Sequence, residues 1–253
     1  MTSLQELEGR RERECRLTPE VALETLDEAE DFLRDRGLLT LMPDSALPSL
    51  FGACHEEPYK RGSRGFGLWP KTKYPWGIML QARPGVCFPR LHAGKGLFMT
   101  IEIASLADPL CRAELARADA GELGEDATRL LAHLQAAGPS LLDDVKTELG
   151  LEPKALRSLR ARLERIGALV PREVRLELPD GGHEHTTELS RWDQIVPEPT
   201  AGGLDELIVA GVRAAVVARI DEPRRWFSWR ADPGRLVAEG RLAEPEPGWI
   251  CLP

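Results

Sequence analysis

Apolar residues recur at helical spacing in three consecutive segments between residues 125 and 166. Gly138-Pro139 ends the first segment and Gly150 the second, because glycine accepts the left-handed cap of a helix and proline cannot extend one. From Ala168 to Pro197 the pattern becomes that of a two-stranded hairpin. Three helices followed by a hairpin are typical of a winged helix-turn-helix, which we predict for residues 125–197. The first two helices are marked by Leu130, Leu131, Leu134, Leu142, Val145 and Leu149.

The third predicted helix, which starts near Lys154, has one apolar and one basic face. At 100° per residue, its three leucines and Ile166 fall within one arc of roughly 120° to 200° around the axis. The opposite side carries Lys154, Arg157, Ser158, Ala161 and Arg165. Arginines can contact phosphates or guanine edges while small side chains let the backbone come close, so this face suits a DNA major groove. A helix that is merely solvated would also show a charged outer face.

The segment before this unit has a similar order of elements. Thr18-Pro19 predicts a helix start and Gly37 a helix stop, since threonine caps the first turn and proline fits the first helical position. A strand is predicted at 38–43, short helices at 45–54 and after Pro75, and a hairpin at 86–104 that turns at 93–96. We therefore predict a winged-helix-like unit over residues 18–104. A charged, frayed arm over residues 1–17 would precede it.

The segment after the central unit predicts a third, smaller repeat of this order. Residues 105–124 connect the first two units through a helix at 109–117, and a Pro- and Gly-containing linker follows Pro197. Helices are expected at 204–220 and 232–240 and a terminal hairpin at 241–253. No repeat of fixed length is visible, so the third unit, 198–253, rests on element order alone. The predicted fold class is α+β, with tandem winged helix-turn-helix units.

Aromatic and basic residues alternate between residues 56 and 83. Such a mixture suits stacking on bases and pairing with phosphates, which makes Trp69, Lys71 and Lys73 candidate DNA contacts. The tryptophans would equally well hold this segment against a core, so packing stays an open alternative for Trp69 and Trp76.

Charge is segregated along the chain, although the net charge is −8. Acidic residues crowd 20–35 and 119–126, whereas 60–73 and 154–165 are basic. Because sequence-independent affinity comes from lysines and arginines that neutralise phosphates, the net charge argues against a protein that coats DNA. We expect double-stranded DNA to be bound through a patch.

The cysteines and histidines give no pattern typical of a metal site. The five cysteines are odd in number and far apart, which predicts reduced thiols in a cytoplasmic protein with no cofactor and no metal. His183 and His185 flank Glu184 near the tip of the predicted hairpin, where a solvated wing is favoured over a metal site. The sequence has no membrane-spanning apolar run, and its densely charged N-terminus does not resemble a signal peptide.

Three phrases give the chain a resemblance to a known family. LRARLERIGALVPRE with HTTELSRWDQIVP is similar to the central unit of the AlkZ/YcaQ-type superfamily of helix-turn-helix DNA glycosylases. FLRDRGLLTLMPDSALPSLFGA resembles the first unit of that family, and GRLVAEGRLAEPEPGWICLP its third. The phrases are degenerate individually, but their order covers nearly the whole chain and most resembles the short, AlkZ-related branch.

The resemblance implies where excision of damaged bases would take place. The family uses Q-x-Q or Q-x-D side chains in the extended segment after the first helix, and here Thr40 and Met42 stand at those positions. Neither can hold a water molecule over the sugar as an amide does. Asp44, Gln81 and Glu102 are the polar residues that could substitute, and each also has an ordinary structural role open to it.

These observations favour a DNA-binding relative of the glycosylases without their chemistry. The predicted contacts are Lys154, Arg157, Ser158, Arg160, Arg165, His183, His185, Trp69, Lys71 and Lys73. One alternative is a DNA repair glycosylase with a rearranged site. A second is a protein–protein interaction module or a transcriptional regulator, which the acidic net charge favours. The sequence does not give the DNA sequence or lesion preference, the oligomeric state or the biological process.

Overall fold

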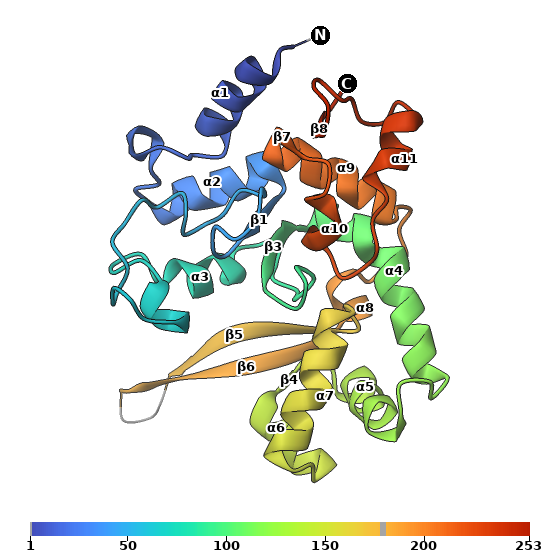
Figure 1. Ribbon diagram of the computed structural model, residues 1–253. Coiled ribbons are helices and arrows are strands. Elements are labelled where there is room, and N and C mark those ends of the chain that lie inside the picture. Colours follow the sequence, from blue (N-terminus) through green and yellow to red (C-terminus); the bar gives the residue numbers. More distant parts are fainter. Residues whose placement is uncertain (1, 178–180) are drawn as a thin grey trace.

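The central unit combines three helices with a three-stranded antiparallel sheet in the computed structural model, which describes residues 2–177 and 181–253 (Figure 1). The strands lie in the order β4-β6-β5, so the third strand is in the middle. The predicted helices and hairpin are confirmed. Strand β4 was not predicted, because two residues are too few to show an alternating pattern. Asp180, in the predicted wing tip, lies outside the described residues. The elements are α5 (Glu125–Ala137), β4 (Ser140–Leu141), α6 (Leu142–Leu149), α7 (Pro153–Arg165), β5 (Leu169–Glu177) and β6 (His183–Arg191).

The first part of the chain forms a second three-stranded sheet with the equivalent strand order, β1-β3-β2. Its strands are antiparallel, with Leu38 opposite Met99 and Cys87 also opposite Met99. The elements are α2 (Leu26–Arg36), β1 (Leu38–Thr40), α3 (Trp76–Met79), β2 (Val86–Cys87) and β3 (Leu97–Thr100), with single 3₁₀ turns at Pro19–Val21, Gly65–Leu68 and Leu80–Ala82.

One predicted helix start and one predicted helix of this part are wrong because long-range hydrogen bonds use the backbone groups there. The first helix starts at Leu26, capped by Thr25, and not at Thr18, since the amide of Leu23 donates to the carbonyl of Ala53. No helix forms at 45–54, where the amide of Leu50 donates to the carbonyl of Thr40 and extends the edge of β1. The predicted helix stop at Gly37 is confirmed, with φ at 81°.

The third part follows the same order with shorter strands: α9 (Leu204–Ala215), β7 (Val217–Arg219), α10 (Pro223–Trp226), α11 (Pro233–Ala238) and β8 (Trp249–Cys251). β8 pairs with β7 on one side, and Cys251 forms a bridge with Ala243 on the other. The predicted hairpin at 241–253 is thus reduced to this bridge. The first helix ends at Ala215 rather than at 220, because residues 217–219 pair with β8.

The connecting segment is one long helix, α4 (Ile101–Asp119), which continues through Pro109. It begins at Ile101, so the predicted hairpin of the first unit ends at Thr100 and not at Ala104. The buried carboxylate of Asp108 in α4 accepts hydrogen bonds from Trp192 Nε1 in α8 (Trp192–Ile195) and from the amide of Thr200, each at 2.9 Å. α4 thereby fixes the exit of the central unit and the linker that follows it.

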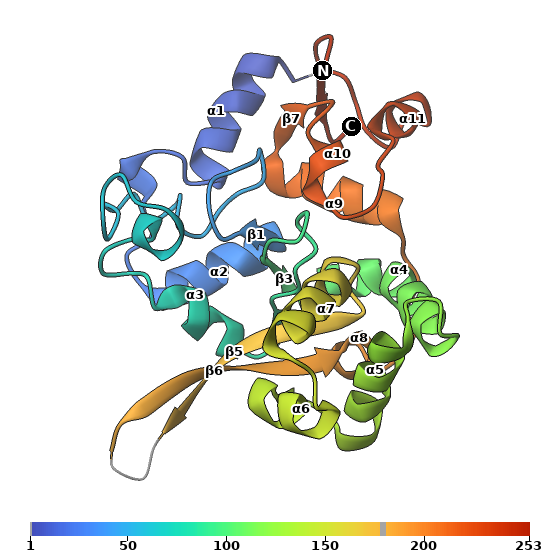
Figure 2. The same ribbon diagram turned by 60° about the horizontal axis from the view of Figure 1, so that its bottom comes forward.

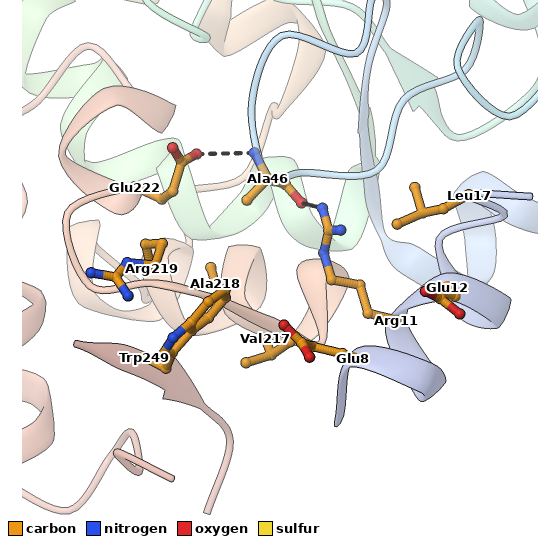
Figure 3. Close-up of a pocket in the computed structure, with 10 residues that line it drawn as sticks. All are labelled: Glu8, Arg11, Glu12, Leu17, Ala46, Val217, Ala218, Arg219, Glu222 and Trp249. Atoms are coloured by element: carbon orange, nitrogen blue, oxygen red, sulfur yellow. Dashed lines mark hydrogen bonds between the residues drawn. The ribbon is translucent and has the colours of Figure 1, made fainter. Parts of the chain in front are cut away.

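The predicted frayed arm is wrong, because residues 4–14 form helix α1 (Leu4–Glu14). Ser3 and Glu6 form a capping box at its start, and Leu7 is buried. Arg11 donates to the carbonyl of Ala46 at 2.8 Å, and the amide of Ala46 donates to Glu222 at 2.9 Å (Figure 3). α1 therefore joins the first and third parts of the chain. Within residues 2–177 and 181–253, no helix is both long and apolar enough to cross a membrane.

Candidate nucleic-acid interface

Helix α7 presents the basic face that its sequence predicts. Pro153 occupies the first turn, and Leu156, Leu159 and Leu163 are buried. Lys154, Arg157, Ser158 and Arg165 are exposed, and in the described chain the three cations among them form no ion pair or side-chain hydrogen bond. Their charges are therefore available to a ligand.

Arg160 lies to the side of this face and is engaged inside the protein. Its Nε is 3.0 Å from Oε1 of Glu164, and only 17% of its side chain is exposed. Oε2 of Glu164 is 3.5 Å from Nε of Arg90, which makes no hydrogen bond within residues 2–177 and 181–253. Arg160 thus balances a buried carboxylate, and we expect less contact with a ligand from it than from Arg157.

Hairpin β5–β6 projects away from helices α5, α6 and α7 of the central unit (Figures 1 and 2). His183 and His185 are exposed on one side of β6, with ring centroids 5.2 Å apart in an edge-to-face arrangement. No group of three or more side chains that could hold a metal ion occurs in the part of the chain that the structure describes.

A cleft of about 520 Å³ lies at the C-terminal end of α7, where the three parts of the chain meet. The first part supplies Lys95, the central unit Arg165, and the third part Arg224, Arg225 and Arg230. Arg225 is paired with Asp221 and Glu222, but Arg165, Arg224 and Arg230 have no charged partner among the described residues. Because these cations surround a concave space, the cleft can hold an anion such as a phosphate group.

The lining of this cleft includes a charged network around Asp44. Nε2 of His92 is 3.1 Å from Oδ1 of Asp44, and Nδ1 is 2.8 Å from the carbonyl oxygen of Trp226. Both ring nitrogens of His92 thus lie within hydrogen-bonding distance of an oxygen atom. Burial raises the pKa of Asp44, but the hydrogen bond from Lys95 and the charge of His92 outweigh it and lower that pKa below its usual value. Asp44 therefore stays ionised in this basic cleft.

The two positions that the family resemblance assigns to catalysis do not face the cleft. Thr40 is buried, and its hydroxyl donates to the carbonyl of Met42 at 2.8 Å, while Met42 packs against the core of the first part. Of the possible substitutes, Gln81 is buried and Glu102 is exposed in the first turn of α4. Asp44 alone among these five residues lines the cleft.

The basic and aromatic segment divides into engaged and exposed residues. Trp69 is half-buried against Phe51, with ring centroids 5.3 Å apart, so the packing alternative holds for it. Lys73 donates to the carbonyl of Leu23 at 2.6 Å and lies 3.1 Å from Glu24. The side chain of Lys71 is exposed, without a partner in the described chain.

A second hollow, of about 460 Å³, lies between α1 and strands β7 and β8 (Figure 3). Its two arginines are occupied, Arg11 by the carbonyl of Ala46 and Arg219 by the ring of Trp249, 5.1 Å away. Glu8 and Glu12 line the same space, which makes this hollow a poorer anion site than the cleft.

Sequence reasoning did not assign Lys95, Arg224 and Arg230 to the site. Lys95 lies in the predicted turn at 93–96, and the two arginines lie between the helices expected at 204–220 and 232–240. The sequence feature that these three residues share is a cation in a turn or connecting segment of a predicted unit. Comparison with known proteins gave no matching family model, curated protein or solved structure for this chain.

Proposed function

We propose that the chain binds double-stranded DNA through three tandem winged-helix units, with α7 in the major groove and the basic cleft on the phosphate backbone. It would be a relative of the helix-turn-helix DNA glycosylases that lacks their catalytic amides. The observation that carries this proposal is the set of unpaired cations that runs along α7 and into the cleft, formed by Lys154, Arg157, Arg165, Arg224 and Arg230.

The strand orders support the assignment of three related units. In the first and central parts, the third strand lies between the first and the second. In the third part, β8 takes the same middle place between β7 and the bridge residue Ala243. A helix precedes the first strand of each unit, as winged-helix units require. The three segments agree in strand order, although their sequences show no repeat. This agreement favours an origin of all three units from one ancestral unit.

Charge placement supports nucleic acid over a protein partner, despite a net charge of −8. Many surface arginines of this chain are paired with neighbouring carboxylates, as Arg117 is with Glu114 and Glu122. Arg157 and Arg165 are left without such partners within the described residues. Unpaired cations on one helix face are what phosphate contacts need, since each contact releases a condensed counterion.

The test is binding to a labelled duplex of about 20 base pairs, measured by fluorescence anisotropy at low salt. The variant combines Arg157→Glu and Arg165→Glu. The matched control combines Arg13→Glu and Arg213→Glu, two other exposed arginines without ion pairs in the described chain, so that the net charge is the same. We expect the first variant to lose at least about tenfold in affinity and the control much less. Equal losses, or none, would refute the proposal.

Asp44 favours one second candidate function, excision of damaged bases. An ionised carboxylate inside a cationic cleft could stabilise the oxocarbenium-like sugar that forms as the glycosidic bond breaks and the base leaves with the bonding electrons. Water would then add to the anomeric carbon and lose a proton to bulk solvent. Release of free base from an alkylated duplex, lost in Asp44→Asn, would support excision. Duplex binding without release over a panel of lesions would reject it.

A further inference from the structure

Exposed apolar side chains are concentrated in one short stretch of the chain. Of the five large hydrophobic residues classed as exposed within the described residues, four lie between residues 59 and 79: Tyr59 at 57%, Phe66 at 47%, Leu68 at 44% and Met79 at 48%. Scattered exposed apolar residues are normal, but a contiguous patch marks a binding surface.

Three aromatic rings of this stretch form a fixed cluster, which we call the ring platform: Tyr59, Phe66 and Tyr74. Phe66 lies 5.5 Å from Tyr59 and 5.3 Å from Tyr74 between ring centroids, and the two tyrosines are 6.2 Å apart. The loop that carries them is held by backbone hydrogen bonds from Tyr59 to Trp69 at 2.7 Å and from Lys60 to Gly67 at 2.8 Å. The rings are therefore positioned before any ligand arrives.

The charges around the ring platform are positive. Residues 56–73 contain five lysines and arginines against two glutamates. Glu57 is paired with Arg61, and Glu56 accepts hydrogen bonds from the amides of Thr72 and Lys73. Lys60, Arg64 and Lys71 remain exposed and without a side-chain partner among the described residues. Unpaired cations thus lie on the same loop as two aromatic side chains that are about half exposed, Tyr59 and Phe66.

A groove of about 700 Å³ continues from Tyr74 between α3 and hairpin β5–β6. Its α3 side is apolar, with Pro75, Ile78 and Met79, and its hairpin side carries Arg172, Arg175, His183 and His185. In both views of the fold the hairpin passes alongside α3 (Figures 1 and 2). Glu173 also lines the groove, and Arg172 and Arg175 are paired with Glu188 and Glu177. The groove therefore has one wall suited to flat apolar groups and one polar wall of mixed charge.

We propose that the ring platform and this groove bind single-stranded nucleic acid, with bases stacked on Phe66 and Tyr59 and phosphates against Lys60, Arg64 and Lys71. This inference rests on the proposed function in part, since it adds an unpaired strand to the duplex bound by α7. Aromatic faces accept every base, and flanking cations follow the backbone, so binding is tolerant of sequence. An acidic, apolar protein segment would meet the same charges but would not need ring faces.

The test uses the full chain and two fluorescent probes, a 20-nucleotide oligothymidine and a fully paired 20-base-pair duplex, each followed by anisotropy at low salt. The variants are Tyr59→Ala with Phe66→Ala, and Phe66→Leu alone. Leu17→Ala serves as the matched control, because Leu17 is the fifth exposed large hydrophobic residue, at 41%, and lies elsewhere. Circular dichroism confirms that each variant is folded.

We expect the double variant to lose at least about fivefold in affinity for oligothymidine, and Phe66→Leu a clear part of that loss. Duplex affinity and the Leu17→Ala protein should change little. The proposal is overturned if oligothymidine does not bind, if the ring variants bind it normally, or if Phe66→Leu keeps full affinity, which would indicate apolar contact without stacking. Loss of duplex affinity alone, in Arg157→Glu with Arg165→Glu, would leave this site intact and test only the proposed function.

Discussion

The side-chain oxygen of Gln81 accepts a hydrogen bond from the backbone amide of Glu173 at 3.1 Å and so joins the first part of the chain to the edge of hairpin β5–β6. The amide nitrogen of the same buried side chain donates to the carbonyl of Gly77 at 2.6 Å. This glutamine thereby links the hairpin to α3.

Replacing this glutamine should loosen the hairpin. Gln81→Leu leaves a buried carbonyl and a strand amide without their partner, so we expect a loss of about 1–3 kcal/mol in the free energy of unfolding. Urea denaturation measures the loss, and hydrogen exchange at Glu173 should accelerate. Gln135→Leu, at an exposed glutamine, is the control and should change stability by less than about 0.5 kcal/mol. Equal stability of the two variants would show that the hydrogen bonds of Gln81 do not stabilise the fold.

Glu164 is predicted to stabilise the packing of α7. Its carboxylate is only 8% exposed and lies between Arg160 and Arg90, so Glu164→Ala leaves two neighbouring cations without their shared partner. We expect a loss of about 2 kcal/mol, since an ion pair broken on one side leaves uncompensated charge. Thermal and urea unfolding provide the measurement, with Glu148→Ala as the exposed control. A change no larger than that of the control would contradict the role assigned to Glu164.

The five cysteines should resist modification in the folded protein. All are buried and unpaired, and burial raises the pKa of Cys15 to about 11 and the pKa values of Cys54 and Cys87 to about 12. Only the thiolate reacts quickly, so at pH 8 the fraction available is very small. A thiol-reactive chromogenic disulfide should label the native chain slowly and all five positions after denaturation. Rapid labelling of any one of them in the native state would contradict this burial.

The Asp44 network should make stability depend on pH in a defined direction. Because the pKa of Asp44 is lowered on folding, its contribution is present above the pKa of the unfolded chain, about 3.9, and is lost as pH falls through the lower folded value. The difference in unfolding free energy between the native chain and Asp44→Asn should therefore shrink between pH 7 and pH 3. A difference that stays constant would show that Lys95 and His92 do not stabilise the ionised form.

Helices with clear periodicity could be predicted from the sequence. Leu156, Leu159 and Leu163 are spaced so that one face of α7 must be buried, and this local pattern fixes both the core and the exposed Arg157. Gly37 and Gly150 end their helices with positive φ, as their type suggests. The exposed basic face of α7 could be predicted because its buried face was predicted correctly.

Features that depend on distant partners could not be predicted. The prediction at 45–54 fails because the amide of Leu50 donates to the carbonyl of Thr40. Helix α1 is held by distant residues, as in the hydrogen bond from Arg11 to the carbonyl of Ala46. The cleft is assembled from turns whose residues lie far apart in the chain, such as Lys95 and Arg224. The periodicity of a sequence does not show which distant residues come into contact. Cations in several turns can therefore be recognised as one site only in the folded structure.

The salt dependence of duplex binding tests the central proposal most directly. If α7 and the cleft contact the phosphate backbone, the logarithm of the association constant should fall with the logarithm of salt concentration, with a slope of about −3 or steeper. The variant with Arg157→Glu and Arg165→Glu should have a slope shallower by about 2, and the Arg13→Glu, Arg213→Glu control should keep the native slope. A native slope near zero, or one unchanged in the α7 variant, would contradict DNA binding through this face.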